Sequence, residues 1–357
     1  MTASSPIARY FMRFATLIFG LALSTAIIAA PAAPNSYQVH NLVSDVSGLA
    51  DNTDANLVNG WGIAMRATSP IWVSNNHTGT STAYDGTGAL KATVTIPAVS
   101  GTGPGVPTGI ASNPSSADFL LAGPGTAAFF LWATEDGGIA AWAGGSSATI
   151  KFAATDGAVY KGLALAGNGT NFRLYAADFH NGKIDVLDTT FAKTTVPGGF
   201  ADPTIPAGFH PFNVLNIQGN LYVVYALKEA DGDDEVAGPG LGFVNVFDAD
   251  GFLLGRVASR GKLNAPWGIA LAPAGFGRFS NHLLVGNFGD GTINAYDPKN
   301  NTFAGQLRTS NGQVLKIDGL WGIAFGNGFQ QQPTDTLFFA AGPDDENHGL
   351  YGKIEAD

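Results

Sequence analysis

Cysteine is absent from this chain of 357 residues, and only 13% of its residues are charged. Without cysteine there is no disulfide to stabilise the fold and no thiol nucleophile. Long amphipathic helices are also missing from the pattern, because no window beyond the N-terminus keeps apolar residues at positions i, i+3, i+4 and i+7. Stability must therefore come from side-chain packing and from the pairing of strands.

Motifs for nucleophilic or nucleotide chemistry are missing as well. The sequence contains no Gly-x-Ser-x-Gly elbow and no His-Glu-x-x-His pair, and these are the local signatures of serine hydrolases and zinc peptidases. No glycine-rich loop precedes a predicted helix, so no nucleotide site is indicated. We therefore assign no catalytic residue from the sequence.

Positive charge is scarce relative to negative charge. Acids outnumber bases by 28 to 18, and the formal net charge is −10. An acidic body repels phosphate backbones, which argues against nucleic acid as a partner.

The N-terminus has the features of a targeting segment. Arg9 and Arg13 form a positive region, residues 14–30 are apolar, and Ala30-Pro31-Ala32 offers a small-x-small cleavage site. We predict a signal peptide over residues 1–32 and a secreted or periplasmic protein with no membrane span after cleavage. The alternative is a retained anchor, because the apolar run approaches the length that crosses a bilayer.

What the sequence does contain is abundant glycine, 48 residues in all, and a repeated turn. The first copy of the turn is Trp61-Gly62-Ile63-Ala64. Its glycine recurs at positions 109, 162, 268 and 322, and Asn213 takes the place of the glycine in the fourth copy. Each copy continues with short apolar runs bounded by Gly, Asn, Asp and Pro, which is typical of strands joined by hairpins. Six such copies predict an all-β, six-bladed β-propeller that occupies residues 33–357 as a single domain.

The two ends of the chain are predicted to complete one blade together. After Gly349–Ile354 the last copy has only three residues left, so it is one strand short. Tyr37–Val43 is an apolar–polar strand with no blade of its own. We expect it to form the outer strand of the last blade, because closing the ring removes the unpaired edges that invite aggregation.

Several motifs along the mature chain resemble a family of uncharacterised exported bacterial proteins, some of which carry a C-terminal PEP-CTERM sorting tail. The motifs are Asn41–Asp45, Ala133–Gly137, Tyr160–Ala164, Val285–Gly291 and Ala341–Glu346. The chain ends at Asp357 without such a tail, which puts surface anchoring in doubt. The resemblance implies a propeller and no activity. More distantly, the repeats look like NHL-type propellers and the calcium-dependent gluconolactonases.

Polar and aromatic residues are predicted to gather on one face of the propeller. The loop before each innermost strand and the loop after each second strand open on the same face, because neighbouring strands are antiparallel. We predict a mouth there, rimmed by carboxylates and carboxamides and walled by aromatic rings, that binds a small-molecule, glycan or protein ligand. The candidate ligand-binding residues are Trp61, Asn75, His77, Glu135, Asp178, His180, Trp267, Asn287, Trp321, Asp344, Glu346 and His348.

Some of these residues also have structural explanations. The three tryptophans occupy equivalent repeat positions, where they would wedge between blades. The loop Pro343–His348 is the least repeat-like of the polar loops and the least explained by turn chemistry. The acidic insertion at residues 228–242 contains Asp231–Glu235 but lacks the glycine and the final glutamate of an EF-hand loop, so we interpret it as a solvated loop.

Calcium is the cofactor that this residue set favours, because hard cations prefer several oxygen ligands. The metal candidates are Glu135, Asp178, Asn287 and Asp344, one from each of four blades. The first functional hypothesis is an exported propeller, expected to be a monomer, that binds a ligand or partner at the acidic–aromatic mouth. The alternative is a calcium-dependent lactonase or esterase-like hydrolase of the gluconolactonase type, in which the metal polarises a carbonyl.

Overall fold

A computed structural model describes residues 1–2, 35–121, 125–169 and 172–357 of the chain. The chain divides into two units, Met1–Ala32 and Ala33–Asp357, of which the second contains all the strands named below. The predicted signal peptide lies outside the described residues except for its first two. Among the described residues, no helix is long and apolar enough to span a bilayer.

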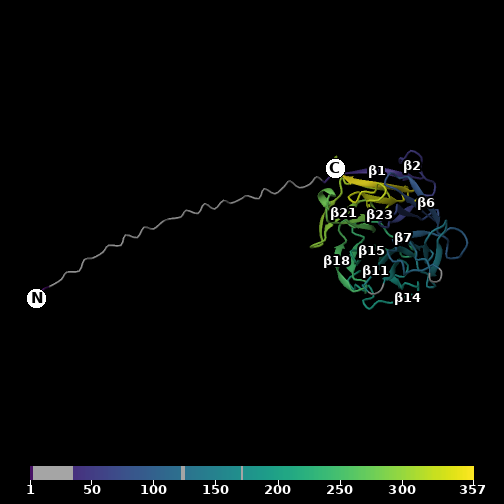
Figure 1. Ribbon diagram of the computed structural model, residues 1–357, viewed down its shortest axis with the longest axis horizontal. Coiled ribbons are helices and arrows are strands. Elements are labelled where there is room, and N and C mark those ends of the chain that lie inside the picture. Colours follow the sequence, from purple (N-terminus) through teal and green to yellow (C-terminus); the bar gives the residue numbers. More distant parts are fainter. Residues whose placement is uncertain (3–34, 122–124, 170–171) are drawn as a thin grey trace. The chain divides into compact units, whose positions relative to one another are not determined.

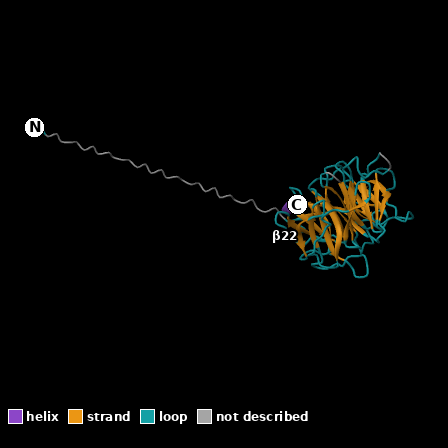
Figure 2. Ribbon diagram, turned by 90° about the horizontal axis from the view of Figure 1, so that it is seen from below, coloured by secondary structure: helices purple, strands orange, loops and turns teal. Residues whose placement is uncertain are grey.

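The fold is all-β and consists of six blades, as the repeats predict. Figure 1 shows the blades following one another in chain order, and Figure 2 shows that strands and loops make up nearly all of the body. The innermost strands are β3 (Gly60–Ala64), β7 (Pro107–Ser112), β11 (Tyr160–Gly167), β15 (Phe209–Ile217), β19 (Pro266–Leu271) and β23 (Leu320–Phe325). The second strands are β4 (Ile71–Asn75), β8 (Phe130–Thr134), β12 (Phe172–Asp178), β16 (Asn220–Leu227), β20 (Leu283–Asn287) and β24 (Leu337–Ala341).

The outer half of each blade is formed by two further strands. The third strands are β5 (Thr80–Tyr84), β9 (Gly138–Trp142), β13 (Lys183–Leu187), β17 (Phe243–Phe247), β21 (Ile293–Asp297) and β25 (Leu350–Ala356). The fourth strands are β6 (Leu90–Thr95), β10 (Thr149–Ala153), β14 (Lys193–Thr194), β18 (Leu253–Ser259), β22 (Thr302–Gln306) and, in the last blade, β1 (Tyr37–Ser44). A 3₁₀ turn, η1 (Gly277–Phe279), precedes β20.

The predicted closure of the ring is confirmed. β1 pairs antiparallel with β25, with Tyr37 opposite Ala356 and Val39 opposite Ile354. A short strand, β2 (Asn52–Thr53), pairs parallel with β1 and makes this blade five-stranded. In Figure 1 the purple β1 lies beside the yellow C-terminal strands. The two ends of the body therefore complete one sheet, which removes an unpaired edge at the join.

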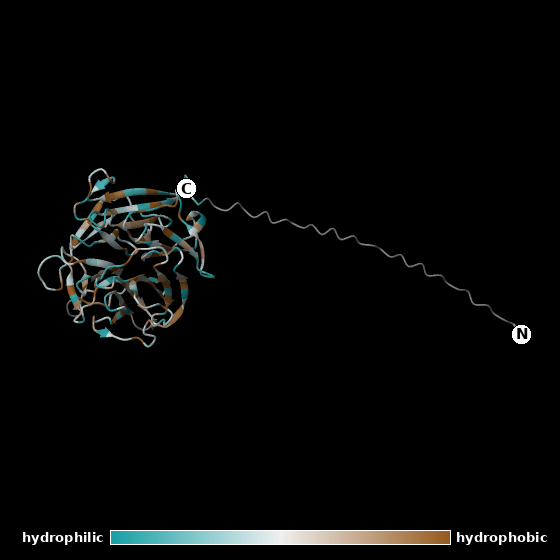
Figure 3. Cartoon of the chain, turned by 180° about the vertical axis from the view of Figure 1, so that it is seen from behind, coloured by the Kyte–Doolittle hydropathy of each residue, from teal (hydrophilic) through white to brown (hydrophobic). Residues whose placement is uncertain are grey.

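Burial falls from the axis outwards along each blade. All five residues of β4, β8, β20 and β24 are buried, whereas four of the six residues of the outer strand β6 are exposed. Figure 3 shows apolar and polar stretches interleaved along the strands. The core consists of the apolar layers between neighbouring blades, where side chains of adjacent second strands meet.

The repeated glycines are explained by how closely the innermost strands approach one another. A Cβ atom on Gly62 would lie 2.5 Å from the Thr108 carbonyl oxygen, and one on Gly109 would lie 2.4 Å from the Leu163 nitrogen. The last strand meets the first in the same way, because a Cβ on Gly322 would lie 2.5 Å from the Trp61 carbonyl oxygen. No side chain fits at these contacts, so glycine is required where these inner strands pack on one another.

The diverged fourth copy makes this contact with a side chain instead. Asn213 replaces the glycine, and its Nδ2 donates a 3.0 Å hydrogen bond to the Trp267 carbonyl oxygen. A side-chain hydrogen bond therefore joins β15 to β19. The inner strands that carry Gly62, Gly109 and Gly322 instead contact the next inner strand directly through the backbone.

We predict that Gly109→Ala destabilises the protein by about 2 kcal/mol or more, because the new methyl group would force two inner strands apart. Urea denaturation at neutral pH measures the change. The matched control is Gly255→Ala in β18, where an added Cβ has no heavy atom within 4 Å and should change stability little. Equal stabilities of the two variants would contradict the close-contact explanation.

Candidate functional site

A buried lysine stands among carboxylates at the face where the innermost strands begin, which we call the upper face. Lys161, the second residue of β11, is only 2% exposed. Its Nζ lies 3.1 Å from Glu135 Oε1 and 2.9 Å from Asp234 Oδ1. Burial would lower the pKa of Lys161, but the neighbouring carboxylates of Glu135, Glu235 and Asp234 outweigh burial and raise it. Lys161 therefore stays charged at any physiological pH.

Two glutamates beside Lys161 hold their protons more tightly than usual. Burial raises the pKa of Glu235 to about 8, although the positive charge of Lys161 opposes the shift. Burial also raises the pKa of Glu346, against a hydrogen bond from Asn59 and the charge of Lys161. We call Lys161, Glu135, Asp234, Glu235 and Glu346 the acidic cluster. It contains four carboxyl groups and one ammonium group, so its charge is not balanced from within.

Amide side chains fix the carboxylates of this cluster in place. Asn59 Nδ2 donates to Glu346 Oε1 at 2.9 Å, and Asn76 Nδ2 donates to Glu135 Oε2 at 2.9 Å. Both asparagines are buried, whereas the neighbouring His77 is exposed, with its Nε2 3.4 Å from Asn59 Nδ2. The carboxylates are therefore oriented by neutral donors.

Glu346 is presented by an unusual turn. Asp344, Asp345 and Glu346 all have positive φ angles, of 58°, 50° and 65°. The Glu346 nitrogen donates to the Gly342 carbonyl oxygen at 3.1 Å, which closes a left-handed turn. Three consecutive non-glycine residues in this region are strained, and such strain is concentrated at functional sites. This is the loop that the sequence singles out as least repeat-like.

Beneath the acidic cluster, tryptophans fill the axis of the propeller. The rings of Trp61 and Trp321 stack with centroids 3.6 Å apart, and Trp267 meets both rings edge-on. They are only 2%, 1% and 3% exposed. The predicted mouth walled by open aromatic rings is therefore not what the structure shows, because these rings close the channel. Lys161 Nζ lies 5.3 Å from the Trp61 ring centroid, so this ring forms part of the floor of the cluster.

Two predicted site residues have local structural partners. Asn75 is buried and donates to the hydroxyl groups of Thr80 and Thr82 within its own hairpin. Asn287 is buried as well; its Oδ1 accepts from the Asn264 nitrogen and its Nδ2 donates to the Lys262 carbonyl oxygen. Their hydrogen bonds hold turns together.

Three further predicted residues lie on exposed parts of the loops. His180 Nδ1 lies 2.7 Å from Asp233 Oδ1 and so holds the acidic insertion. His348 Nδ1 lies 2.8 Å from Asp45 Oδ2, and this hydrogen bond raises the pKa of His348. Asp344 is exposed, with its Oδ2 3.9 Å from His348 Nε2.

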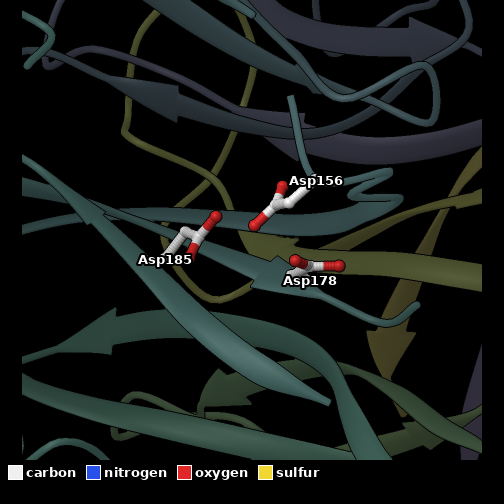
Figure 4. A group of neighbouring side chains, drawn as sticks. All are labelled: Asp156, Asp178 and Asp185. Atoms are coloured by element: carbon white, nitrogen blue, oxygen red, sulfur yellow. The ribbon is translucent and has the colours of Figure 1, made fainter. Parts of the chain in front are cut away.

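The predicted metal ligands are not gathered into one group. Among the described residues, the histidine, aspartate and glutamate side chains that could hold a metal together are Asp156, Asp178 and Asp185, with oxygen atoms within 4.8 Å of one another. Figure 4 shows these three carboxylates converging on blade three. Of the four predicted ligands this group includes only Asp178, while Glu135 lies in the acidic cluster and pairs with Lys161.

Two lysines already neutralise part of this aspartate group. Lys183 Nζ lies 2.5 Å from Asp156, 3.5 Å from Asp178 and 3.3 Å from Asp185. Lys193 Nζ lies 2.8 Å from Asp185 and 3.4 Å from Asp156. The hydrogen bond from Lys183 lowers the pKa of Asp156 to about 2. The group has suitable oxygen donors for a cation, but ammonium groups compete for them.

The residues at the centre of the site are not those that the sequence predicts. Lys161 is the only charged residue among the six that precede the repeated glycine position, and this departure is the one signal that marks it. The acidic insertion is not simply the solvated loop that its composition indicates, because its Asp234 contacts Lys161 directly. The folding of this insertion back onto the axis has no sequence signal, because it depends on contacts between blades.

Sequence comparison gives two long matches. No family model matches the chain. Uncharacterized protein R648 of Acanthamoeba polyphaga mimivirus is 34% identical over 337 residues, covering 90% of this chain and 81% of its own length. Uncharacterized protein L690 of the same virus is 34% identical over 340 residues, covering 90% and 86%. The chain belongs to the family of these viral proteins. These relatives are viral and not the exported bacterial proteins that the motifs resemble.

Solved structures support the fold of this family member. A streptogramin B lyase matches with a TM-score of 0.53 and 13% identity, covering 90% of this chain and 97% of its own. A glucose dehydrogenase matches with a TM-score of 0.54 and 14% identity, covering 90% and 100%. At such low identity the likeness extends to the propeller fold and not to activity.

We predict that Lys161→Met destabilises the protein by about 3 kcal/mol at pH 7, because it removes a buried charge and leaves the half-buried carboxylates of Glu135 and Glu346 without a counter-charge. The loss should shrink as the pH falls towards 5, where these carboxyl groups can take up protons. Urea denaturation at both pH values measures this. The control Lys353→Met removes a surface ion pair with Glu355 and should cost at most about 0.5 kcal/mol. A Lys161→Met variant as stable as its parent would contradict the assigned role.

Proposed function

We propose that the protein is a binding propeller whose acidic cluster takes up a cationic ligand, a small molecule or peptide that carries an amine or guanidinium group. The observation that carries this proposal is the gathering of four carboxyl groups, from the loop after β8, the acidic insertion and the loop after β24, around the one ammonium group of Lys161. A second cation would balance the charge that Lys161 leaves unpaired.

The exposure of the carboxylates is consistent with access for such a ligand. The side chain of Asp234 is 76% exposed and that of Glu135 is 24% exposed, whereas Lys161 lies beneath them. A ligand arriving from solvent would therefore meet carboxylate oxygens first. The negative charge of the whole chain would also draw a cation towards the protein from a distance.

The raised pKa of Glu235 gives this binding a defined pH dependence. Near pH 7 Glu235 is mostly protonated, because its pKa is about 8. A bound cation favours the ionised form, so binding near pH 7 would release a proton. Affinity should therefore rise as the pH increases through 8, where the carboxylate forms without the ligand.

We also propose that this binding takes place outside the cytoplasm, in the secreted or periplasmic location that residues 1–32 predict. The support is the positive region with Arg9 and Arg13, followed by the apolar stretch. N-terminal sequencing of protein recovered from expressing cells would test this, since export with cleavage should leave a chain that begins near residue 33.

Calorimetric titration with agmatine, which carries both an amine and a guanidinium group, tests cation binding. We expect the affinity to be about fivefold or more higher at pH 8.5 than at pH 6.5, since Glu235 is mostly ionised only at the higher pH. Glu235→Gln should remove most of this pH dependence. The control is Glu355→Gln, which breaks a surface ion pair with Lys353 away from the acidic cluster and should retain the pH dependence.

Two results would count against cation binding. The first is equal affinity for agmatine at the two pH values in the parent protein. The second is tighter binding of an uncharged polyol such as sorbitol, which would indicate that the site recognises hydroxyl groups instead.

Calcium-dependent hydrolysis of the gluconolactonase type is the second candidate. The observation in its favour is the Asp156, Asp178 and Asp185 group, whose oxygen atoms lie within 4.8 Å of one another. A calcium ion there would be held by these carboxylates and would polarise a bound carbonyl group. Lys183 and Lys193 count against it, because an ion would have to displace their ammonium groups.

Thermal unfolding in calcium and in EDTA separates the two candidates. We expect millimolar calcium to leave the melting temperature unchanged, because the two lysines already pair with all three aspartates. A rise in melting temperature that Asp156→Asn abolishes would instead favour the hydrolase, since a ligand that binds only the folded state stabilises it.

A further inference from the structure

The opposite face of the propeller, where the innermost strands end, contains a cavity of about 580 Å³. We call this the lower face and its cavity the funnel. The lining comes from the ends of the innermost strands β3, β7, β11, β15 and β23 and is mainly apolar, with Met65, Ile110, Leu165, Leu215 and Phe325. The volume falls within the range of small-molecule sites, about 300–1,000 Å³.

Two long hairpins raise one wall of the funnel. β11 and β15 have eight and nine residues, whereas the other innermost strands have five or six. Leu165 and Leu215 belong to these two strands and line the funnel. Phe172, at the start of β12, adds a ring that is 37% exposed. The lining of the funnel is mainly apolar, which favours an apolar ligand.

The funnel does not connect with the acidic cluster. Towards the upper face the axis narrows to a space of about 10 Å³ lined by Gly62, Gly109, Gly322 and Trp267. That space is about the volume that one water molecule needs. A ligand in the funnel therefore cannot reach Lys161, and the two faces are chemically independent.

A second cavity of about 410 Å³ shares Met65, Ser112 and Pro114 with the funnel and contains Arg66. The Arg66 guanidinium lies 4.7 Å from the ring centroid of Phe129. Across the described parts of the chain, this guanidinium group has no hydrogen bond and no carboxylate partner, and its contact with the ring leaves its N–H groups free.

On the other side of the funnel, the side chain of Asn216 already has hydrogen-bond partners. Asn216 Nδ2 donates to the Leu165 carbonyl oxygen at 2.8 Å, and its Oδ1 accepts from the Gly219 nitrogen at 2.9 Å. None of the described residues that line the funnel itself is charged, so the charged group nearest to it along this lining is Arg66 in the adjoining cavity.

We propose that the funnel binds an amphipathic carboxylate, with its apolar body among Leu165, Leu215 and Phe325 and its carboxylate paired with Arg66. Two features of the site favour an amphipathic carboxylate. The apolar lining excludes water from a hydrocarbon body, and a guanidinium group binds a carboxylate through two parallel N–H groups. This site is separate from the proposed cation site and does not depend on it.

Calorimetric titration with decanoate, at a concentration below micelle formation, tests the proposal. We expect the parent protein to bind decanoate and Arg66→Gln to bind it about tenfold more weakly, because the charge-assisted hydrogen bonds are lost. Decanol, which has no charge, should bind the parent and Arg66→Gln equally. Leu215→Glu should weaken binding of both ligands, since it places a carboxylate in the apolar wall.

The matched control is Arg260→Gln. Arg260 also lies over aromatic rings, 5.5 Å from the Phe243 centroid, but lines neither the funnel nor the adjoining cavity that contains Arg66. The Arg260→Gln variant should bind decanoate as tightly as the parent protein does. The proposal is overturned if the parent does not bind decanoate, if Arg66→Gln binds it as tightly as the parent, or if Arg260→Gln weakens binding as much. Since Glu235→Gln should affect agmatine and not decanoate, failure of one site is distinguishable from failure of the other.

Discussion

The close contact of six innermost strands around one axis is the constraint on which the rest of the structure depends. The spacing leaves no room for a Cβ atom at Gly62, Gly109 or Gly322, so the strands meet backbone to backbone. An axis this narrow cannot remain an open channel, and the rings of Trp61, Trp267 and Trp321 fill its upper end. The propeller consequently has two separate faces.

Charge on the upper face follows from that closed axis. With indole rings as a floor, Lys161 has little water around it and relies on Glu135 and Asp234 for stabilisation. The same burial that makes Lys161 dependent on carboxylates makes extra carboxylates costly, which is why the pKa of Glu235 is raised to about 8. A site in which one cation serves four acids is favourable for a proton or for a second cation, and less favourable for an anion.

The fold is predictable from the sequence because its signals are local and repeated. The glycine of each inner strand and the unpaired strand at Tyr37–Val43 are visible within a few residues, and the pairing of β1 with β25 follows from counting strands. The candidate site is only partly predictable. Strand direction alone places Glu135 and Glu346 on the correct face, but Lys161 gains its significance from Asp234, a residue distant in sequence that the insertion folds onto it. The funnel has no sequence signal, because its lining residues are ordinary apolar residues at strand ends, the part of a strand that a sequence defines least well.

Departures from the repeat therefore mark both candidate sites. Identical blades would give the same side chain six times around the axis, and a symmetric ring cannot orient a small asymmetric ligand. Lys161 in the place of a tryptophan, the insertion that carries Asp234 and the left-handed turn at Asp344–Glu346 break that symmetry on the upper face. Two lengthened hairpins and Arg66 break it on the lower face. The regular part of the sequence builds the ring, and recognition depends on the few residues that do not repeat.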